Sequence, residues 1–444
     1  MMKLVYVGML ACWLGLWSAF SALAQQATFY QTVQPLIHAK CAVCHRPGEA
    51  APFPLITYED VAKRATFIKK VVSSGYMPPW RADDHYTTFA NKRSLTPEQI
   101  STITNWIDAG LPKGKVRRDA EEALMMRVNA GTAYNRPPDL TLKLDKPFRQ
   151  SGDGVERFMV FKLPFELASA ANVAALEFTS TNKNVIHHAN FAIHPVEDTT
   201  ISLTKTIAQV DLNGADAWRY QEWMPYKKQM TYYGGWIPGS SVETYPEDMG
   251  WVLPKRGVVL LTVHLGPAGK DEDVIAGVNF FFKKTPIKRT VNVISLGSGG
   301  IAEKNINPPL LLFGGEVKTC SLQVAYQNQP ITLLYAWPHM HQVGKEFTAF
   351  ATVPNADTLK LVHIPDWDFR WQELYRYQKP VVLPTGSVVN VIGTYDNTDA
   401  NPMNPNKPAK LITSDGKMRS DQEMMTLILI YTTYQPGDEN LRLD

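Results

Sequence analysis

The sequence predicts a multidomain protein in which a small all-α domain is followed by two all-β domains, each an antiparallel sandwich of the jelly-roll type. The chain has 444 residues, a length typical of about three domains. Apolar residues recur at helical spacing in residues 25–117, whereas after residue 138 short alternating runs are separated by Pro, Gly and Asn. The composition, 45% hydrophobic and 20% charged, is that of a globular protein.

The charge balance restricts the class of partner. The formal net charge is +3, with 45 basic and 42 acidic side chains, and no basic run is long. A protein that binds nucleic acid or a membrane surface would carry a much stronger positive bias. We therefore expect no nucleic-acid partner.

The first 24 residues are typical of a Sec-type signal peptide. Lys3 gives a positive start, Leu4 to Phe20 are mostly apolar, and Ala22-Leu23-Ala24 forms a small-residue cleavage site. The apolar run is roughly long enough to cross a bilayer, so an uncleaved anchor is the alternative. We expect cleavage, a periplasmic or secreted protein, and no stable membrane span afterwards.

The all-α domain is expected over residues 25–117. Amphipathic runs cover residues 29–37 and 58–72, and a third helix is expected to begin after Thr96 and to stop at Gly110. Thr96 is a favourable N-cap because its hydroxyl can accept from a free N–H of the first turn, Pro97 suits the first helical position, and glycine commonly ends helices.

The β-rich part is expected to begin after a linker over residues 118–137. The first β domain is assigned to residues 138–300 and the second to residues 301–444, with the boundary in a Gly-rich stretch. Runs such as Val-Val-Leu-Leu-Thr-Val at 258–263 are typical of buried strands.

The chain has four cysteines, and none is expected to form a disulfide. Cys12 would leave with the signal peptide, and Cys41 and Cys44 belong to the motif described next. Cys320 is then alone, and we expect it to be a buried small apolar residue.

The run Cys41-Ala42-Val43-Cys44-His45 has the C-x-x-C-H pattern that attaches a c-type haem. The two thiols form thioethers to the porphyrin, and the histidine reaches the iron. Met77, in Gly-Tyr-Met-Pro-Pro-Trp, is the candidate for the second axial ligand, with ordinary packing as its alternative role. The sequence therefore predicts one covalent haem, which is bound by Cys41, Cys44, His45 and Met77.

Residues 32–114 resemble a class I cytochrome c domain. The matching pieces are C-A-V-C-H, M-P-P-W and L-T-P-E-Q-I. The resemblance implies electron transfer. We expect His38 to be a helix-surface or packing residue, with iron or a haem propionate as the alternative, and His85 to be solvated.

The histidines of the β-rich part are grouped. His187 and His188 are adjacent, His264 lies in a strand-like run, and His339 and His341 form an H-x-H. Residues i and i+2 of a strand point to the same side, so the last two imidazoles can converge on one ion. Adjacent residues of a strand face opposite ways, so His187 and His188 could bind the same ion only at a bulge or at a strand end.

Residues 138–435 resemble the copper type II, ascorbate-dependent monooxygenases, the group that contains peptidylglycine α-hydroxylating monooxygenase and dopamine β-monooxygenase. The resemblance is carried by N-V-I-H-H-A-N-F-A-I, L-T-V-H-L-G, P-H-M-H-Q-V-G-K and D-Q-E-M-M-T-L-I-L-I-Y, in that order.

The resemblance implies two mononuclear copper sites. The electron-donating copper would be held by His187, His188 and His264. The oxygen-binding copper would be held by the catalytic residues His339, His341 and Met424, with Met425 as the neighbour to test against Met424. A thioether ligand favours Cu(I), the form that meets oxygen. The resemblance implies no copper-binding role for His194, and we expect that His363 is not a metal ligand either.

The chain differs from the family at the positions that bind the substrate. Peptide-amidating members clamp a carboxylate with Arg, Asn and Tyr, but the matching positions here are Trp337, Thr426 and Ile428. Bidentate recognition by arginine has no substitute at these positions. A peptidylglycine substrate is therefore not expected, and a more apolar one is favoured. Animal members are also disulfide-rich, and His194 stands at one of their cysteine positions.

The predicted function is an exported monooxygenase that hydroxylates a C–H bond of a small organic substrate with O₂. The haem would supply electrons to the two copper sites, and a periplasmic redox protein or a small reductant would reload the haem. One alternative is a non-enzymatic haem and copper electron relay. Another is a cytochrome fused to a β-sandwich that binds a partner protein and whose histidines are vestigial.

Overall fold

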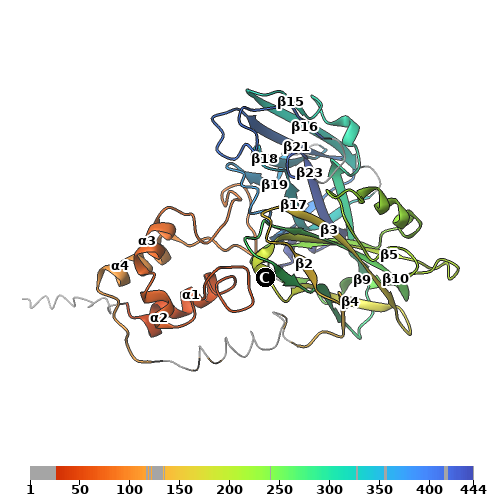
Figure 1. Ribbon diagram of the computed structural model, residues 1–444. Coiled ribbons are helices and arrows are strands. Elements are labelled where there is room, and N and C mark those ends of the chain that lie inside the picture. Colours follow the sequence, from red (N-terminus) through yellow and green to blue (C-terminus); the bar gives the residue numbers. More distant parts are fainter. Residues whose placement is uncertain are drawn as a thin grey trace, which may run out of the picture.

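The computed structural model describes residues 27–116, 119, 122, 134, 136–240, 242–326, 329–354, 358–414 and 419–443. The predicted signal peptide, Cys12 and most of the predicted linker lie outside the described residues. Figure 1 shows a helical unit, in red and orange, beside a larger body of strands.

The helical unit comprises residues 27–116. Its helices are η1 (Phe29–Val33), α1 (Gln34–Lys40), α2 (Tyr58–Ala62), α3 (Ala65–Ser73) and α4 (Pro97–Asp108). Thr57 and Thr96 each form a capping box with the residue three positions later, which satisfies free N–H groups at the starts of α2 and α4. The run expected as one helix over residues 58–72 is therefore two helices, α2 and α3. Phe29 and Trp106, both fully buried, lie in the small core of this unit.

The first β unit covers residues 136–290. Its larger sheets have the orders β1-β12-β4-β9-β13, with β8 paired to β4, and β6-β3-β10-β5-β7, and β11 pairs with β2. The strands are β1 (Leu140–Lys143), β2 (Phe148–Gln150), β3 (Arg157–Glu166), β4 (Ala171–Ser180), β5 (Ile186–Pro195), β6 (Gln209–Asp211), β7 (Tyr232–Trp236), β8 (Glu243–Thr244), β9 (Met249–Leu253), β10 (Arg256–Leu265), β11 (Glu272–Val274), β12 (Ala276–Phe282) and β13 (Arg289–Thr290).

The second β unit covers residues 292–443. Its sheets have the orders β14-β23-β17-β20 and β16-β21-β18-β19, and β15 pairs with β22. The strands are β14 (Asn292–Gly297), β15 (Leu311–Leu312), β16 (Glu316–Tyr326), β17 (Ile331–His339), β18 (Gly344–Thr352), β19 (Thr358–Ile364), β20 (Tyr375–Leu383), β21 (Ser387–Asn397), β22 (Ile412–Thr413) and β23 (Thr426–Thr433). Short 3₁₀ helices connect strands in both units: η2 (Lys183–Val185), η3 (Ala217–Tyr226), η4 (Glu303–Asn305) and η5 (Asp438–Asn440).

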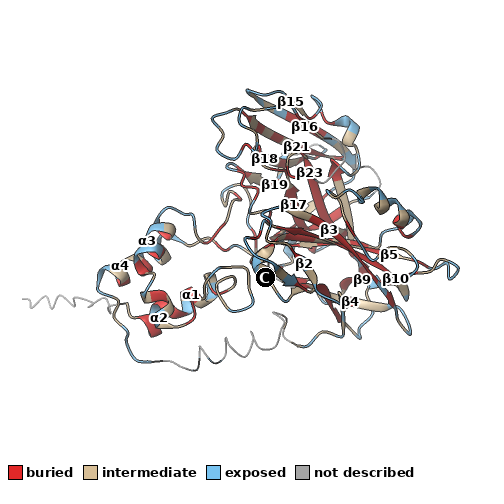
Figure 2. Ribbon diagram, in the orientation of Figure 1, coloured by how far each residue is buried: buried red, intermediate tan, exposed pale blue. Residues whose placement is uncertain are grey.

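The predicted all-β, antiparallel organisation of the larger body is confirmed. Within the described residues every strand pairing is antiparallel except the short pairing of β13 with β9. Inward side chains of both β units, such as Phe161, Phe280 and Leu429, belong to one core cluster, and Figure 2 shows the buried positions along these strands. Since β14 begins at Asn292 and pairs with β23, we include the chain from residue 292 in the second unit, whereas the sequence-based assignment began this unit at residue 301.

The helical unit contacts the second β unit directly. The Phe89 ring packs on Tyr375 and Tyr377 of β20, at centroid distances of 4.8 and 5.5 Å. Backbone hydrogen bonds reinforce the contact: the amide of Asp83 donates to the carbonyl of His363 at 2.8 Å, and that of Ala90 to the carbonyl of Arg376 at 2.8 Å. The units are therefore joined by packing as well as by the chain.

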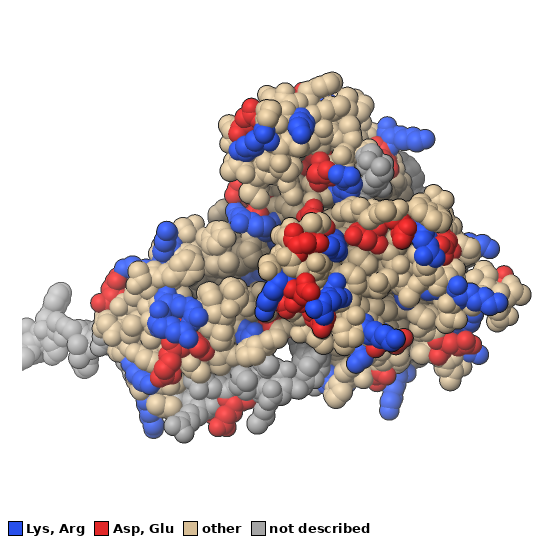
Figure 3. All heavy atoms as spheres, viewed as in Figure 1, with Lys and Arg blue, Asp and Glu red and all other residues tan. Residues whose placement is uncertain are grey.

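The surface has no dominant charge. Figure 3 shows basic and acidic side chains interspersed over the face in view, in keeping with the small net charge. Among the described helices, none has both the length and the apolar character needed to cross a bilayer. The described cysteines, Cys41, Cys44 and Cys320, are unpaired, and Cys320 is fully buried as expected.

Candidate functional site

The first group of predicted ligands is the histidine triad, which we define as His187, His188 and His264. Strands β5 and β10 pair with His264 opposite His188, and the next pair joins Leu265 to Ile186. His187 is therefore the extra residue of a β-bulge, which re-aims its side chain. The bulge that two adjacent histidines need in order to face one ion is present.

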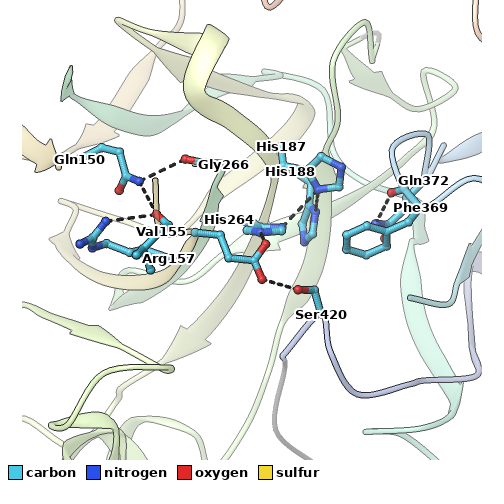
Figure 4. A network of polar contacts seen from close by, with 11 residues as sticks. Gln150, Val155, Arg157, His187, His188, His264, Gly266, Phe369, Gln372 and Ser420 are labelled. Carbon is cyan, nitrogen blue, oxygen red and sulfur yellow. Dashed lines mark hydrogen bonds and ion pairs between the residues drawn. The ribbon is translucent and has the colours of Figure 1, made fainter. Parts of the chain in front are cut away.

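The triad nitrogens converge. Nδ1 of His187 lies 3.1 Å from Nδ1 of His188 and 3.2 Å from Nδ1 of His264. One ring nitrogen from each residue lies within 4.8 Å of the others, and Figure 4 shows the three rings turned toward one another. Nitrogens that ligate one ion at about 2.0–2.1 Å lie roughly 3 Å apart, so the triad fits a bound metal.

Burial favours the neutral form of two triad imidazoles, those of His187 and His188. It lowers the pKa of His187 to about 3 and lowers the pKa of His188 well below its usual value, with the neighbouring imidazoles adding to both shifts. The neutral ring is the form that binds a metal ion. These side chains therefore offer lone pairs at any physiological pH.

Glu156 supports the triad from behind. Its Oε2 atom lies 3.0 Å from Nε2 of His264, and its Oε1 atom accepts a hydrogen bond from the Ser420 hydroxyl of the second β unit. The hydrogen bond to His264 is the main reason that the pKa of Glu156 is low. A carboxylate at this position orients a metal-binding imidazole and makes it more basic. No motif in the sequence indicates Glu156.

The second group is the His-x-His pair, His339 and His341, at the end of β17. Their ring centroids are 4.9 Å apart. Nδ1 of His339 lies 2.5 Å from Oε1 of Gln372, and Nδ1 of His341 lies 3.0 Å from the carbonyl of Gln422. These bonds place the proton on Nδ1 and leave Nε2 as the metal-binding nitrogen. Burial lowers the pKa of His339 to about 4 and that of His341 to about 3.

The two adjacent methionines have different environments. Met425 is fully buried, and its sulfur and that of Met340 lie 3.1 and 3.3 Å from the position of an added Cβ at Gly393. Met340 lies between His339, the last residue of β17, and His341, which is two residues further along the chain. Met424 is half-buried, and its methyl carbon lies 3.7 Å from the position of an added Cβ at Gly299.

One phenyl ring lies between the triad and the His-x-His pair. The centroid of Phe369 is 4.9 Å from that of His187 and 5.6 Å from that of His341. Figure 4 shows this ring beside the triad, with Gln372 close by. Sequence analysis did not indicate Phe369 or Gln372, because neither belongs to a recognised motif.

The predicted haem-binding residues line one cavity of about 470 Å³, whose walls include Cys41, Cys44, His45 and Met77. Nδ1 of His45 lies 3.0 Å from the carbonyl of Phe53, which leaves Nε2 for an iron ion. Two buried N–H groups among the lining residues, Nε of Arg93 and Nε1 of Trp371, have no partner in the described structure. The residues present fit a haem, with donors to spare for its propionates.

The thiols of the C-x-x-C-H motif are not poised to bind a metal themselves. Burial raises the pKa of Cys41 to about 12 and also raises the pKa of Cys44. A thiol held in the protonated form is a poor metal ligand. The cavity that these cysteines line also reaches the β-rich body, because His187 of the triad and Arg370 lie in its wall.

The remaining histidines join neither group. Nε2 of His38 contacts the carbonyl of Ile56 at 2.9 Å, and His85 is exposed as expected. His194 is buried, with Nδ1 2.6 Å from the carbonyl of Gln229, and His363 lies 3.3 Å from both Asp83 and Glu346. The polar contacts of His38, His194 and His363 in the described structure are with backbone carbonyls or carboxylates, and none is with another histidine.

The three positions that depart from the family are packed inside the protein. Trp337 is buried and donates from Nε1 to the carbonyl of Gln372 at 3.1 Å, and the Thr426 hydroxyl donates to the carbonyl of Ser298 at 2.8 Å. Ile428 is buried as well. None of the three offers a cation to a carboxylate.

Comparisons with known proteins are uninformative. No family model and no curated protein matches the chain. Among solved structures, the chain is similar to the major capsid protein P2 of bacteriophage PM2, at 9% identity over 67% of this chain and 98% of that one, with a TM-score of 0.26. It is also similar to a peptide-N(4)-(N-acetyl-β-D-glucosaminyl)asparagine amidase, at 11% identity over 67% and 97%, with a TM-score of 0.25. Likenesses this low carry no argument.

Proposed function

We propose that this chain is an exported, haem- and copper-dependent monooxygenase that hydroxylates a C–H bond of a small organic substrate with O₂. One observation carries the proposal. His187, whose Nδ1 converges with those of His188 and His264, also lies in the wall of the cavity that Cys41 and Cys44 line. A haem in that cavity and a metal in the triad would be neighbours.

The helical unit supports the haem part of the proposal. His45 and Met77 line the cavity from separate segments, as the two axial ligands of a class I cytochrome c would. Histidine and methionine ligation raises the reduction potential of a haem and suits electron transfer rather than oxygen binding. In this interpretation the helical unit delivers electrons and leaves oxygen chemistry to the β-rich body.

The two histidine groups support the copper part. The triad offers three imidazoles, whereas the His-x-His pair with Met424 offers two imidazoles and a thioether, a softer set that favours Cu(I). When bound, copper would supply one-electron chemistry with O₂. Burial favours the neutral form of four of these imidazoles, those of His187, His188, His339 and His341. Glu156, Gln372 and the Gln422 carbonyl orient the rings of His264, His339 and His341. In this proposal the catalytic residues are His339, His341 and Met424.

The three positions that differ from the family's substrate-binding residues restrict the class of substrate. Trp337 and Ile428 are buried and apolar, and Thr426 uses its hydroxyl within the protein. A carboxylate-bearing peptide would find no cation at these positions. A small organic molecule without a carboxylate anchor is the substrate class that these residues favour, and an external redox protein or small reductant would supply the electrons.

Metal analysis and oxygen uptake test this proposal. The purified full chain should contain one haem iron and two copper ions, and substrates should stimulate oxygen uptake. We expect His339→Ala to lose hydroxylation while the haem spectrum is unchanged, because His45 lies in a different unit. Near-zero copper with an intact haem, or hydroxylation by His339→Ala at the wild-type rate, would contradict the proposal.

An electron relay without substrate oxidation is a second candidate. The shared cavity alone favours it, since it joins a haem site to the triad without involving a substrate. The relay leaves the His-x-His pair without a purpose, although Gln372 and Gln422 orient both of its rings. Oxygen uptake that does not respond to any organic substrate, in a protein loaded with both metals, would favour the relay.

A further inference from the structure

A short segment of the second β unit, residues 366–373, contacts the histidine groups and the helical unit at the same time. It connects β19 to β20 and has no helical or strand structure of its own. Its shape therefore depends on side-chain contacts rather than on a backbone ladder.

The middle of the segment orients the His-x-His pair. Oε1 of Gln372 lies 2.5 Å from Nδ1 of His339, and Nε2 of Gln372 donates to the carbonyl of Phe369 at 2.8 Å. The Phe369 ring packs on His341, and Nε1 of Trp367 donates to the carbonyl of His341 at 3.1 Å. Both imidazoles of the pair are thus held by this segment.

The ends of the segment are held by the helical unit. Arg81 donates to Asp366 at 2.7 Å and to Asp368 at 2.9 Å. At the other end Arg93 forms a buried ion pair with Glu373, and Nδ2 of Asn91 donates to the same carboxylate at 3.1 Å. These residues come from the stretch that follows Met77 in the helical unit.

The ion pairs of Asp368 with Arg81 and of Glu373 with Arg93 involve buried carboxylates, and such pairs restrain the backbone that carries them. The side chains of Asp368 and Glu373 are only 7% and 4% exposed. Asp368 is also bound by Arg370 of the same segment, at 2.8 and 2.7 Å, so losing Arg81 would remove its tie to the helical unit and not its whole compensation. Glu373 has Arg93 and Asn91 as its partners, and removing the partner of a buried charge forces the backbone that carries it to move. An exposed pair would adjust without such a shift.

We propose that the helical unit is part of the scaffold of the His-x-His metal site. Arg81 and Arg93 set the position of the 366–373 segment, and Phe369 and Gln372 then fix the orientations of His339 and His341. Arg81 is a positioning residue in this scheme, because it touches neither imidazole. The inference rests on the proposed function only in taking copper as the metal of that site.

The test uses Arg81, which does not line the haem cavity. The full chain with its covalent haem is prepared as wild type, Arg81→Gln, Arg81→Lys and the matched control Arg149→Gln, which breaks an exposed pair with Asp271. Cu(I) affinity of each site is measured by competition with a chromophoric chelator, and the haem absorption spectrum is recorded. The two sites are assigned with His264→Ala and His339→Ala.

We expect Arg81→Gln to weaken copper binding at the His-x-His site by about 10-fold or more, the usual effect of losing support for a metal ligand. The triad affinity and the haem spectrum should stay at the wild-type values. Arg81→Lys should recover part of the loss because it keeps the charge, and Arg149→Gln should change nothing.

Two results would overturn the inference alone: wild-type copper affinity at both sites in Arg81→Gln, or an equal loss at the two sites, which would indicate general loosening. A wild-type chain that binds no copper would overturn both this inference and the proposed function. The outcomes are therefore distinguishable.

Discussion

At the scale of single residues, Glu243 is a buried carboxyl group with a hydrogen-bond partner for only one of its two oxygens in the described structure. This glutamate of β8 is 5% exposed. Its Oε1 accepts a hydrogen bond from Tyr245 at 2.5 Å, whereas its Oε2 has no partner in the described structure. Burial raises the pKa of Glu243 to about 8. The folded protein therefore holds a proton on this carboxyl group at neutral pH.

This proton makes stability depend on pH. A pKa of about 8 in the folded state lies above the unfolded value of 4.5, so the stabilising contribution is complete below pH 4.5 and is lost as pH rises to about 8. We expect Glu243→Gln to unfold a few degrees higher than wild type at pH 8, and to differ less at pH 5. Thermal unfolding at both values measures this, with the exposed Glu166→Gln as control. An equal shift at the two pH values would contradict it.

At the scale of elements, the pairing of strands decides which residues meet. The bulge in β5 turns His187 toward His188, and the close approach of β7 to β17 depends on a glycine. A Cβ added at Gly235 of β7 would lie 2.0 Å from the Trp337 ring of β17. The indole fills the space that a side chain on β7 would need.

Gly235→Ala should therefore destabilise the protein. The methyl group forces Trp337 out of its position, and overpacking of this kind costs about 1–3 kcal/mol. The matched control is Gly269→Ala, since no atom lies within 4 Å of its added Cβ. Denaturant unfolding of the two variants measures the difference. Equal stabilities would show that the indole moves without cost.

At the scale of the whole molecule, the helical unit is docked on the second β unit, and the cavity that Cys41 and Cys44 line extends to His187 of the triad. Phe89 is central to that contact, as it is 4% exposed between Tyr375 and Tyr377. In the proposed function the two units exchange electrons, so tethering would raise the effective concentration of one at the other, and fixed docking would add a defined geometry.

Phe89→Ala should loosen this docking. Deleting a buried phenylalanine ring costs about 3–5 kcal/mol, and here the loss falls on the contact between units. We expect faster hydrogen exchange in residues 83–93 and 375–377, with little change in the helices that pack around Trp106. Phe313→Ala, at a position 57% exposed, is the control. Unchanged exchange in both segments would show that other contacts carry the docking.

Much of this organisation is predictable from the sequence where the signal is local. The capping box at Thr96, the alternation of the strands and the burial of Cys320 all follow from neighbouring residues. Prediction from the sequence fails where interacting residues lie far apart along the chain. Glu156 supports His264 from 108 positions away, and its other partner, Ser420, is 264 positions away.

The sequence by itself determined the class of each element and the types of ligand available: thiols with a following histidine, paired histidines, and a methionine before an apolar strand. Only the tertiary structure decided that His187 also lies in the wall of the cavity that Cys41 and Cys44 line, and that Phe369 lies between the two histidine groups. The reason is physical. Secondary structure and ligand chemistry depend on near neighbours, whereas the distance between sites depends on how whole sheets and helices pack.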